Sequence, residues 1–180
     1  MSEVVFKNTL AGLVALLGPE VRTPALEARL TELGLSLAVP PAQLDRLKWN
    51  EVIRVCAAAL SPDLSEDAAN FKLGRGVIDG MRHSFAGKAQ AAMAQLLGPK
   101  RMLELFRTML ASGNNYSQTR VVKGGDTSVE FWINETGAQQ PSFVAGLLAA
   151  CVEISGGKDA QVTLRTVSAT DGATYDVSWR

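Results

Sequence analysis

The chain has 180 residues, of which 47% are hydrophobic and 20% are charged. Eighteen Lys and Arg balance eighteen Asp and Glu, so a partner held mainly through a phosphate backbone is not expected. This hydrophobicity argues against disorder, and the longest strongly apolar run, Leu10 to Leu17, is too short to cross a bilayer. One domain over residues 1–180 is the simplest prediction.

The first two thirds of the chain are predicted to be helical. Residues 4–6 form a short strand or a lead-in to the first helix, which Thr9 caps and Gly18-Pro19 ends. Thr23-Pro24 opens the second helix, with Thr as the N-cap and Pro at the first helical position, and Gly34 ends it.

Two longer helical regions follow. Apolar residues recur at steps of three and four from Trp49 until Ser61-Pro62. A second apolar-periodic segment runs from Ser65 to the stop at Leu97-Gly98-Pro99. That length is unusual for one helix, and Gly87 is a plausible break.

After Asn115 the apolar period changes from 3.6 to 2, which indicates strands. A helix that begins at Pro141-Ser142 separates two predicted hairpins, whose strands are residues 116–122, 129–133, 162–167 and 175–179. We therefore predict an α+β fold in which N-terminal helices pack on a C-terminal four-stranded antiparallel sheet with a ββαββ order.

No familiar catalytic or metal-binding pattern is present. His83 is the only histidine, and Arg82 beside it favours a partly exposed or helix-packing imidazole. Gly74-Arg75-Gly76 lacks both the spacing and the preceding strand of a phosphate loop, so these glycines are expected to let helices approach closely. One histidine and two distant cysteines do not make a zinc site. We predict no cofactor and no metal.

The two cysteines, Cys56 and Cys151, lie among apolar residues and are expected to be reduced and packed as small hydrophobic side chains. Glu3 weakens the basic start that a signal peptide needs, and Gly18-Pro19-Glu20 is not a cleavage site. The expected location is the cytoplasm, without a membrane span.

The most distinctive polar stretch is Asn114 to Arg120. One interpretation is structural, because Asn tolerates the left-handed conformation at a helix–strand junction and can bond neighbouring backbone. The other is a ligand or partner contact made by Tyr116 and Arg120. An enzyme would need a cleft that gathers polar groups; the candidates are His83, Asn114, Arg120 and Glu135.

Several motifs together resemble a large paralogous family best known from myxobacteria, a domain of unknown function of about this length. They are Asn114 to Arg120, Phe131-Trp132-Ile133-Asn134-Glu135, Phe143 to Leu148, Tyr175 to Trp179, and the N-terminal Leu17-Gly18-Pro19, Thr23-Pro24 and Leu33-Gly34-Leu35.

More distantly, residues 142–179 resemble the end of vinyl-reductase-type (V4R) domains, which are similar in fold to haem-nitric-oxide-binding domains and to Golgi transport (TRAPP) subunits. This resemblance implies helices that enclose a space for a hydrophobic ligand, and several relatives that dimerise through helices. The cysteine-rich end of many V4R domains is missing here, and His83 does not align with a haem ligand, so the resemblance does not imply haem or metal.

We therefore expect a non-enzymatic cytoplasmic regulatory or sensor domain that binds a small apolar ligand or a protein partner, without nucleic acid. The predicted ligand-binding residues are Phe85, Met93, Trp132, Phe143, Leu147 and Cys151, each of which could instead be plain core. The alternative is a homodimeric scaffold without a ligand, whose apolar seam would be formed by Met102, Leu105, Phe106 and Met109.

Overall fold

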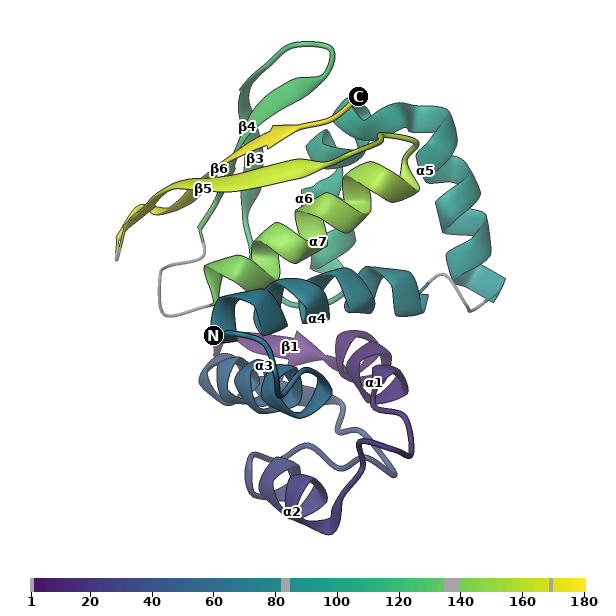
Figure 1. Ribbon diagram of the computed structural model, residues 1–180, viewed down its shortest axis with the longest axis vertical. Coiled ribbons are helices and arrows are strands. Elements are labelled where there is room, and N and C mark those ends of the chain that lie inside the picture. Colours follow the sequence, from purple (N-terminus) through teal and green to yellow (C-terminus); the bar gives the residue numbers. More distant parts are fainter. Residues whose placement is uncertain (1, 82–84, 135–139, 169) are drawn as a thin grey trace.

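The chain folds into stacked layers of sheet and helix, as the computed structural model in Figure 1 shows. The structure describes residues 2–81, 85–134, 140–168 and 170–180, leaving out the side chains of residues 81 and 85–91. A four-stranded antiparallel sheet lies at one end, a central helix lies beneath it, and most of the N-terminal elements lie beyond that helix. The predicted α+β fold with a four-stranded antiparallel sheet is confirmed.

The sheet is made of two hairpins. The first joins β3 (Thr119–Gly124) to β4 (Ser128–Ile133), and the second joins β5 (Gln161–Ser168) to β6 (Gly172–Ser178). The spatial order is β3-β4-β6-β5, so the hairpins meet through β4 and β6. Successive side chains of a strand point to opposite faces, and the inner face buries Val129, Phe131, Ile133, Tyr175 and Val177.

The outer face of the sheet is polar and charged. The Arg165 guanidinium donates to the carboxylates of Glu130 and Asp176, which lie on two neighbouring strands. The register between β5 and β6 shifts between Leu164 and Thr166, on either side of this arginine.

The central layer is α7 (Pro141–Ile154), and every residue from Phe143 to Val152 is buried. Strands β5 and β6 pack on one side of α7, and α4 (Glu66–Met81) packs on another. Of the N-terminal helices, α5 (Phe85–Glu104) and α6 (Phe106–Ala111) contact the sheet directly. Helix α4 reaches the sheet through α7 (Figure 1).

Glycines let α4 and α7 cross at close range. A Cβ atom on Gly74 would stand 2.1 Å from the backbone oxygen of Phe143, and one on Gly146 would stand 2.1 Å from the backbone oxygen of Phe71. No residue other than glycine fits at either position without moving a backbone. The prediction that Gly74 serves helix packing rather than a phosphate is therefore confirmed.

The N-terminal elements form their own layer below α4 (Figure 1). Strand β1 (Val4–Phe6) pairs antiparallel with β2 (Gln43–Asp45), a strand that the sequence pattern does not predict. Helices α1 (Lys7–Leu16), α2 (Pro24–Glu32) and α3 (Arg46–Leu60) complete the layer, and both α1 and α3 pack on α4.

The helix caps follow the sequence in part. Thr23 is the N-cap of α2, and its Oγ1 accepts from the Leu26 amide at 3.2 Å, as predicted. The prediction that Thr9 caps α1 is wrong, because α1 begins two residues earlier and the Thr9 hydroxyl donates to the Gly113 carbonyl at 3.3 Å. Asp45 is the N-cap of α3, and its carboxylate accepts from the amides of Leu47 and Lys48.

The long apolar-periodic segment from Ser65 is two helices, α4 and α5. Helix α4 ends at Met81, α5 begins at Phe85, and the predicted break at Gly87 lies within α5; residues 82–84 lie outside the described residues. The stop predicted at Gly98-Pro99 is confirmed, because Gly98 has φ 76° and ψ 166° and divides α5 into two helical pieces.

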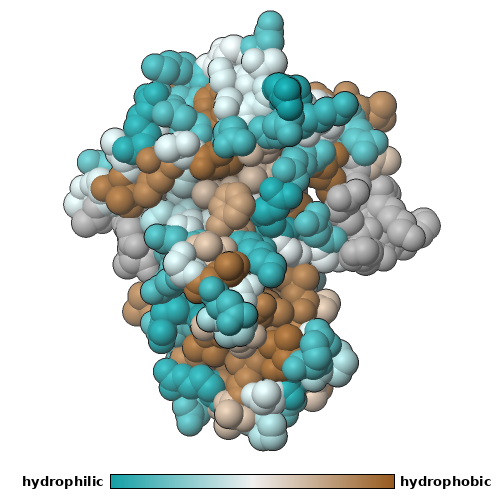
Figure 2. Space-filling model, viewed as in Figure 1, coloured by the Kyte–Doolittle hydropathy of each residue, from teal (hydrophilic) through white to brown (hydrophobic). Residues whose placement is uncertain are grey.

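Figure 2 shows polar atoms over much of the sheet and apolar atoms at the surface near α2 and α3. The side chains of Val39 and Leu47 are 71% and 74% exposed in that region of the chain. None of the helices in the described part of the chain combines the length and hydropathy needed to cross a bilayer.

Candidate functional site

An apolar cavity of about 120 Å³ lies where the N-terminal layer meets the C-terminal part of the chain. Residues of β1, α1, α3, α4, α6, α7, the end of β4 and the stretch 112–117 line it. Its apolar wall includes Trp49, Ile53, Ile78, Phe106, Phe143 and Leu147. No Asp, Glu, Lys, Arg, His or Cys lines it within the described residues.

Helical spacing explains how α1 and α3 reach the cavity. Asn8 and Gly12 are four residues apart on α1 and therefore share one face. Asn50 and Ile53 are three residues apart on α3. A Cβ atom added to Gly12 would meet nothing within 4 Å, so this glycine leaves part of the space open.

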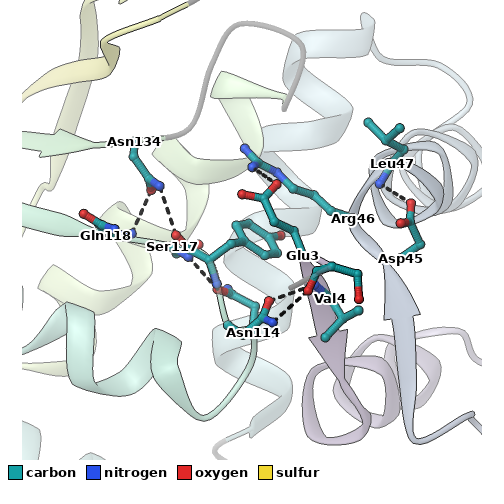
Figure 3. Close-up of polar contacts among 12 residues, drawn as sticks. Glu3, Val4, Asp45, Arg46, Leu47, Asn114, Ser117, Gln118 and Asn134 are labelled. Atoms are coloured by element: carbon teal, nitrogen blue, oxygen red, sulfur yellow. Dashed lines mark hydrogen bonds and ion pairs between the residues drawn. The ribbon is translucent and has the colours of Figure 1, made fainter.

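The segment Asn114–Gln118 contributes Asn114, Tyr116 and Ser117 to the cavity wall, and its hydrogen bonds link the N-terminal layer to the sheet (Figure 3). The Asn115 amide side chain accepts from the Val4 amide at 2.8 Å and donates to the Ser2 carbonyl at 2.9 Å. On the sheet side, Asn134 accepts from the Gln118 amide at 2.7 Å and donates to the Tyr116 carbonyl at 2.9 Å. Hydrogen bonds therefore hold the segment to β1 at one end and to Asn134, directly after β4, at the other.

Asn114 and Tyr116 show which interpretation of this stretch the structure favours. Asn114 Oδ1 accepts from the amides of Tyr116 and Ser117, so its predicted role in bonding neighbouring backbone is confirmed. Its backbone does not adopt the expected left-handed conformation, because the only non-glycine residues with positive φ in the described chain are Gln140 and Asp159.

Tyr116 lines the cavity, and a cation covers its ring. The Arg46 guanidinium carbon stands 4.4 Å from the ring centroid, and Arg46 also pairs with Glu3 (Figure 3). The alternative role predicted for Arg120 is not supported, since Arg120 stacks at 4.1 Å on Trp132 on the outer face of the sheet.

The structure does not bring the six predicted ligand-binding residues together. Phe143 and Leu147 line the cavity. Cys151 is buried further along α7, and Trp132 points away from the cavity, with its Nε1 donating to the Asp171 carbonyl at 2.6 Å. Met93 is 64% exposed on α5. The Phe85 side chain lies outside the described residues.

Sequence reasoning missed Asn8, Trp49 and Asn50 as wall residues. A usable signal exists for the two asparagines, because each is an uncharged polar residue within an otherwise apolar helical stripe. Nothing local distinguishes Trp49 from ordinary core, since its edge-on contact with Phe143, at 6.4 Å between centroids, joins elements about ninety residues apart.

The prediction of an exposed apolar dimer seam is wrong, because most of its residues pack inward. Phe106 is 1% exposed and packs edge-on against Phe131, with ring centroids 5.7 Å apart. Met102 is buried, and Met109 packs against the core and lines the cavity. These side chains stabilise the fold of one copy and do not form an exposed apolar surface.

In the described part of the chain, the proposed catalytic residues do not gather in one cleft, and neither thiol is reactive. Asn114 lies in the cavity wall and Arg120 on the outer sheet face, while His83 and Glu135 lie outside the described residues. Burial raises the pKa of both Cys56 and Cys151 to about 12, so each stays a protonated thiol at neutral pH. The described residues contain no group of three His, Cys, Asp or Glu side chains that could hold a metal ion.

The model of a family described as "Protein of unknown function (DUF2378)" matches residues 3–180. None of the curated proteins compared with the chain matches its sequence.

Solved structures of H-NOX domains share the fold. An Fe(II) unliganded H-NOX protein from K. algicida is 12% identical, with a TM-score of 0.65 over 96% of this chain and 95% of that one. An oxygen-binding H-NOX domain related to soluble guanylate cyclases is 14% identical, with a TM-score of 0.64 over 96% and 92%. An H-NOX protein from S. oneidensis in the Fe(II)NO state is 9% identical, with a TM-score of 0.65 over 94% and 98%.

At these identities the likeness shows the fold alone. The resemblance to haem-nitric-oxide-binding domains is thus confirmed at the level of architecture. Whether the chain also resembles V4R and TRAPP proteins stays a prediction.

The described residues do not fit a haem. A cavity of about 120 Å³ is close to the roughly 150 Å³ that holds one benzene molecule, and an iron porphyrin is several times larger than benzene. Protein ligands of haem iron are His, Cys, Met or Tyr, and the described wall offers Met109 and Tyr116 but no His or Cys. It also offers no Lys or Arg to pair with the propionates of the porphyrin.

Proposed function

This chain belongs to the DUF2378 family, and on that premise we propose that it is a non-enzymatic sensor domain that binds a small apolar molecule in the cavity between its two halves. The molecule binds without haem. Its binding favours the arrangement of the two halves in which the cavity is complete.

One observation carries the proposal: both halves of the chain build the wall. Gly12 and Ile53 come from the N-terminal layer, whereas Phe106 and Leu147 come from the elements that contact the sheet. A molecule that contacts both halves has a different affinity for each way in which they can be arranged. Such a difference is what lets a ligand shift a conformational equilibrium.

The H-NOX structures support the proposal of a sensor only through the fold that they share with this chain. Two of them are structures with a diatomic molecule, oxygen in one and NO on iron in the other. The fold therefore accommodates ligand binding in those proteins. Because the wall residues here do not fit haem, the ligand of this chain contacts protein side chains directly.

Toluene tests the proposal as a small apolar probe. At a free concentration of ten times its dissociation constant, a ligand raises the free energy of unfolding by about 1.4 kcal/mol, which in a chain of this size raises Tm by roughly 3–6 °C. The occluding variant is Gly12→Leu, because the space beside Gly12 is empty. The matched control is Ala11→Leu, which adds an identical side chain at the neighbouring, exposed position of α1.

We expect toluene to raise the Tm of the parent and of Ala11→Leu, and to leave Gly12→Leu unchanged. Equal shifts in all three proteins place the probe elsewhere and contradict the proposal, and so does the absence of a shift in the parent. Native mass spectrometry of protein purified from its own cells then identifies the natural ligand as an extra mass that Gly12→Leu lacks.

A further inference from the structure

We propose that the cavity selects an uncharged molecule of about the size of a single aromatic ring that carries one neutral hydrogen-bonding group. This inference rests on the proposed function and adds the chemical class of the ligand. Three properties of the site lead to it: its volume, the absence of charge in its described wall, and two amide side chains at its edge.

The volume sets the size of the ligand. A cavity of about 120 Å³ accommodates about six to eight non-hydrogen atoms, since roughly 150 Å³ accommodates benzene. Aromatic rings of Trp49, Phe106 and Phe143 stand in the wall. Trp49 and Phe143 already meet edge-on at an interplanar angle of 81°. A ligand ring packed beside them continues that arrangement at favourable energy.

The wall excludes ions. An isolated charge moved from water into an apolar space loses its hydration at great cost unless an opposite charge receives it. The described wall offers none. Arg46 stacks on Tyr116 outside the wall and is already paired with Glu3. A carboxylate or an ammonium group of the right size therefore has no counter-ion to meet.

The edge of the cavity provides neutral hydrogen bonds. Asn8 and Asn50 line it from α1 and α3, where Asn8 is exposed and Asn50 is half-buried. Neither makes a side-chain hydrogen bond with the described part of the chain. An amide both donates and accepts, so the pair can bond a ligand hydroxyl, which donates and accepts, or a ligand carbonyl, which only accepts. An apolar ring with one such group uses both the interior and the edge.

Three probes of similar shape test the effect of charge: benzyl alcohol, benzylammonium of the same size, and the slightly larger benzoate, with toluene as the reference. Titration calorimetry at neutral pH measures their affinities for the full chain. We expect benzyl alcohol to bind more tightly than toluene, and both ions to bind at least about 100-fold more weakly than benzyl alcohol.

Two variants of one edge residue test the assignment. Asn50→Leu should remove the preference for benzyl alcohol over toluene while leaving toluene bound. Asn50→Asp should improve benzylammonium binding by about tenfold or more, because it adds the missing counter-ion. Urea unfolding of both variants verifies that they fold, which is expected because Asn50 is only half-buried.

The outcomes distinguish this inference from the proposed function. If toluene binds and either ion binds as tightly as benzyl alcohol, the neutral-ligand inference is overturned and the proposed function stands. Toluene binding together with an unchanged benzyl alcohol preference in Asn50→Leu overturns the role of the amides. If none of the four probes binds, the proposed function fails and the inference fails with it.

Discussion

At the scale of single residues, the missing side chains of two glycines decide how the layers pack. Gly74 and Gly146 each stand where a Cβ atom would collide with a backbone oxygen of the partner helix. The sequence could predict that Gly74 serves packing. It could not show that Gly146 is the opposing residue, because the two are far apart in the chain and only tertiary contact relates them.

Gly74→Ala should therefore lower the free energy of unfolding by about 3 kcal/mol or more, since the collision forces α4 and α7 apart. Gly76→Ala is the control in the same helix, where the added Cβ would stand 3.5 Å from Leu16 Cδ1, an ordinary contact. That control should gain roughly 0.5–1 kcal/mol from reduced backbone entropy. Urea titrations of the two variants decide, and similar stabilities would contradict the close crossing.

The buried thiols give stability a specific dependence on alkaline pH. In the folded chain the pKa of Cys56 and of Cys151 is raised from 9.0 to about 12 by burial. Above pH 9 the unfolded chain loses both protons while the folded chain keeps them. The folded state then binds more protons, so the free energy of unfolding falls as pH rises toward 12.

Each thiol contributes about 1.4 kcal/mol per pH unit to this fall. Unfolding measured between about pH 9.5 and 10.5 should show a slope that is shallower by that amount in Cys151→Ala and also in Cys56→Ala. A variant with the parental slope would show that its thiol ionises equally well in both states.

At the scale of elements, the segment Asn114–Gln118 is a connection whose position is fixed by side-chain amides. Its density of polar residues distinguishes the segment in the sequence, and that pattern predicts the local hydrogen bonds of Asn114. The pattern does not predict the bonds of Asn115 to β1 and of Asn134 to the segment, because they join residues that are 111 and 16 positions apart in the chain.

Asn134→Ala should cost about 1–3 kcal/mol of stability, because it leaves the Gln118 amide and the Tyr116 carbonyl without their side-chain partner. Hydrogen exchange should show faster exchange at the Gln118 amide. In the control Gln118→Ala the backbone amide still donates to Asn134, so stability should change by less than about 0.5 kcal/mol. Unchanged protection in Asn134→Ala would show that this side chain does not hold the segment.

At the scale of the whole molecule, the amino-acid sequence predicts which segments are helices and strands better than it predicts how these elements are arranged in space. The change of apolar period near residue 115 located the strands, and glycine and proline located most helix ends. Helix α7 is buried from Phe143 to Val152, and this includes its small residues Ala145, Ala149 and Ala150. Alanine is compatible with buried and exposed positions alike, so a stripe of alanines does not reveal a helix covered on all sides.

The same difficulty explains why the cavity was only partly predicted. Phe143 and Leu147 belong to α7 and were identified because that helix is strongly apolar. The opposite wall comes from α1 and α3, whose contribution depends on the β1–β2 pairing that positions them. No periodicity within either helix encodes that pairing.

The irregular register of β5 affects how copies of the chain meet in concentrated solution. Strand β5 is an outermost strand of the described sheet, so one of its edges has no neighbouring strand there, and Leu164 and Val167 are exposed. Such an edge can template incoming strands and seed fibres. The shift between Leu164 and Thr166 interrupts the even spacing of the backbone amides and carbonyls, so a straight strand from a second molecule can pair on only one side of it. The register shift in β5 thus hinders the addition of strands from other copies at this edge.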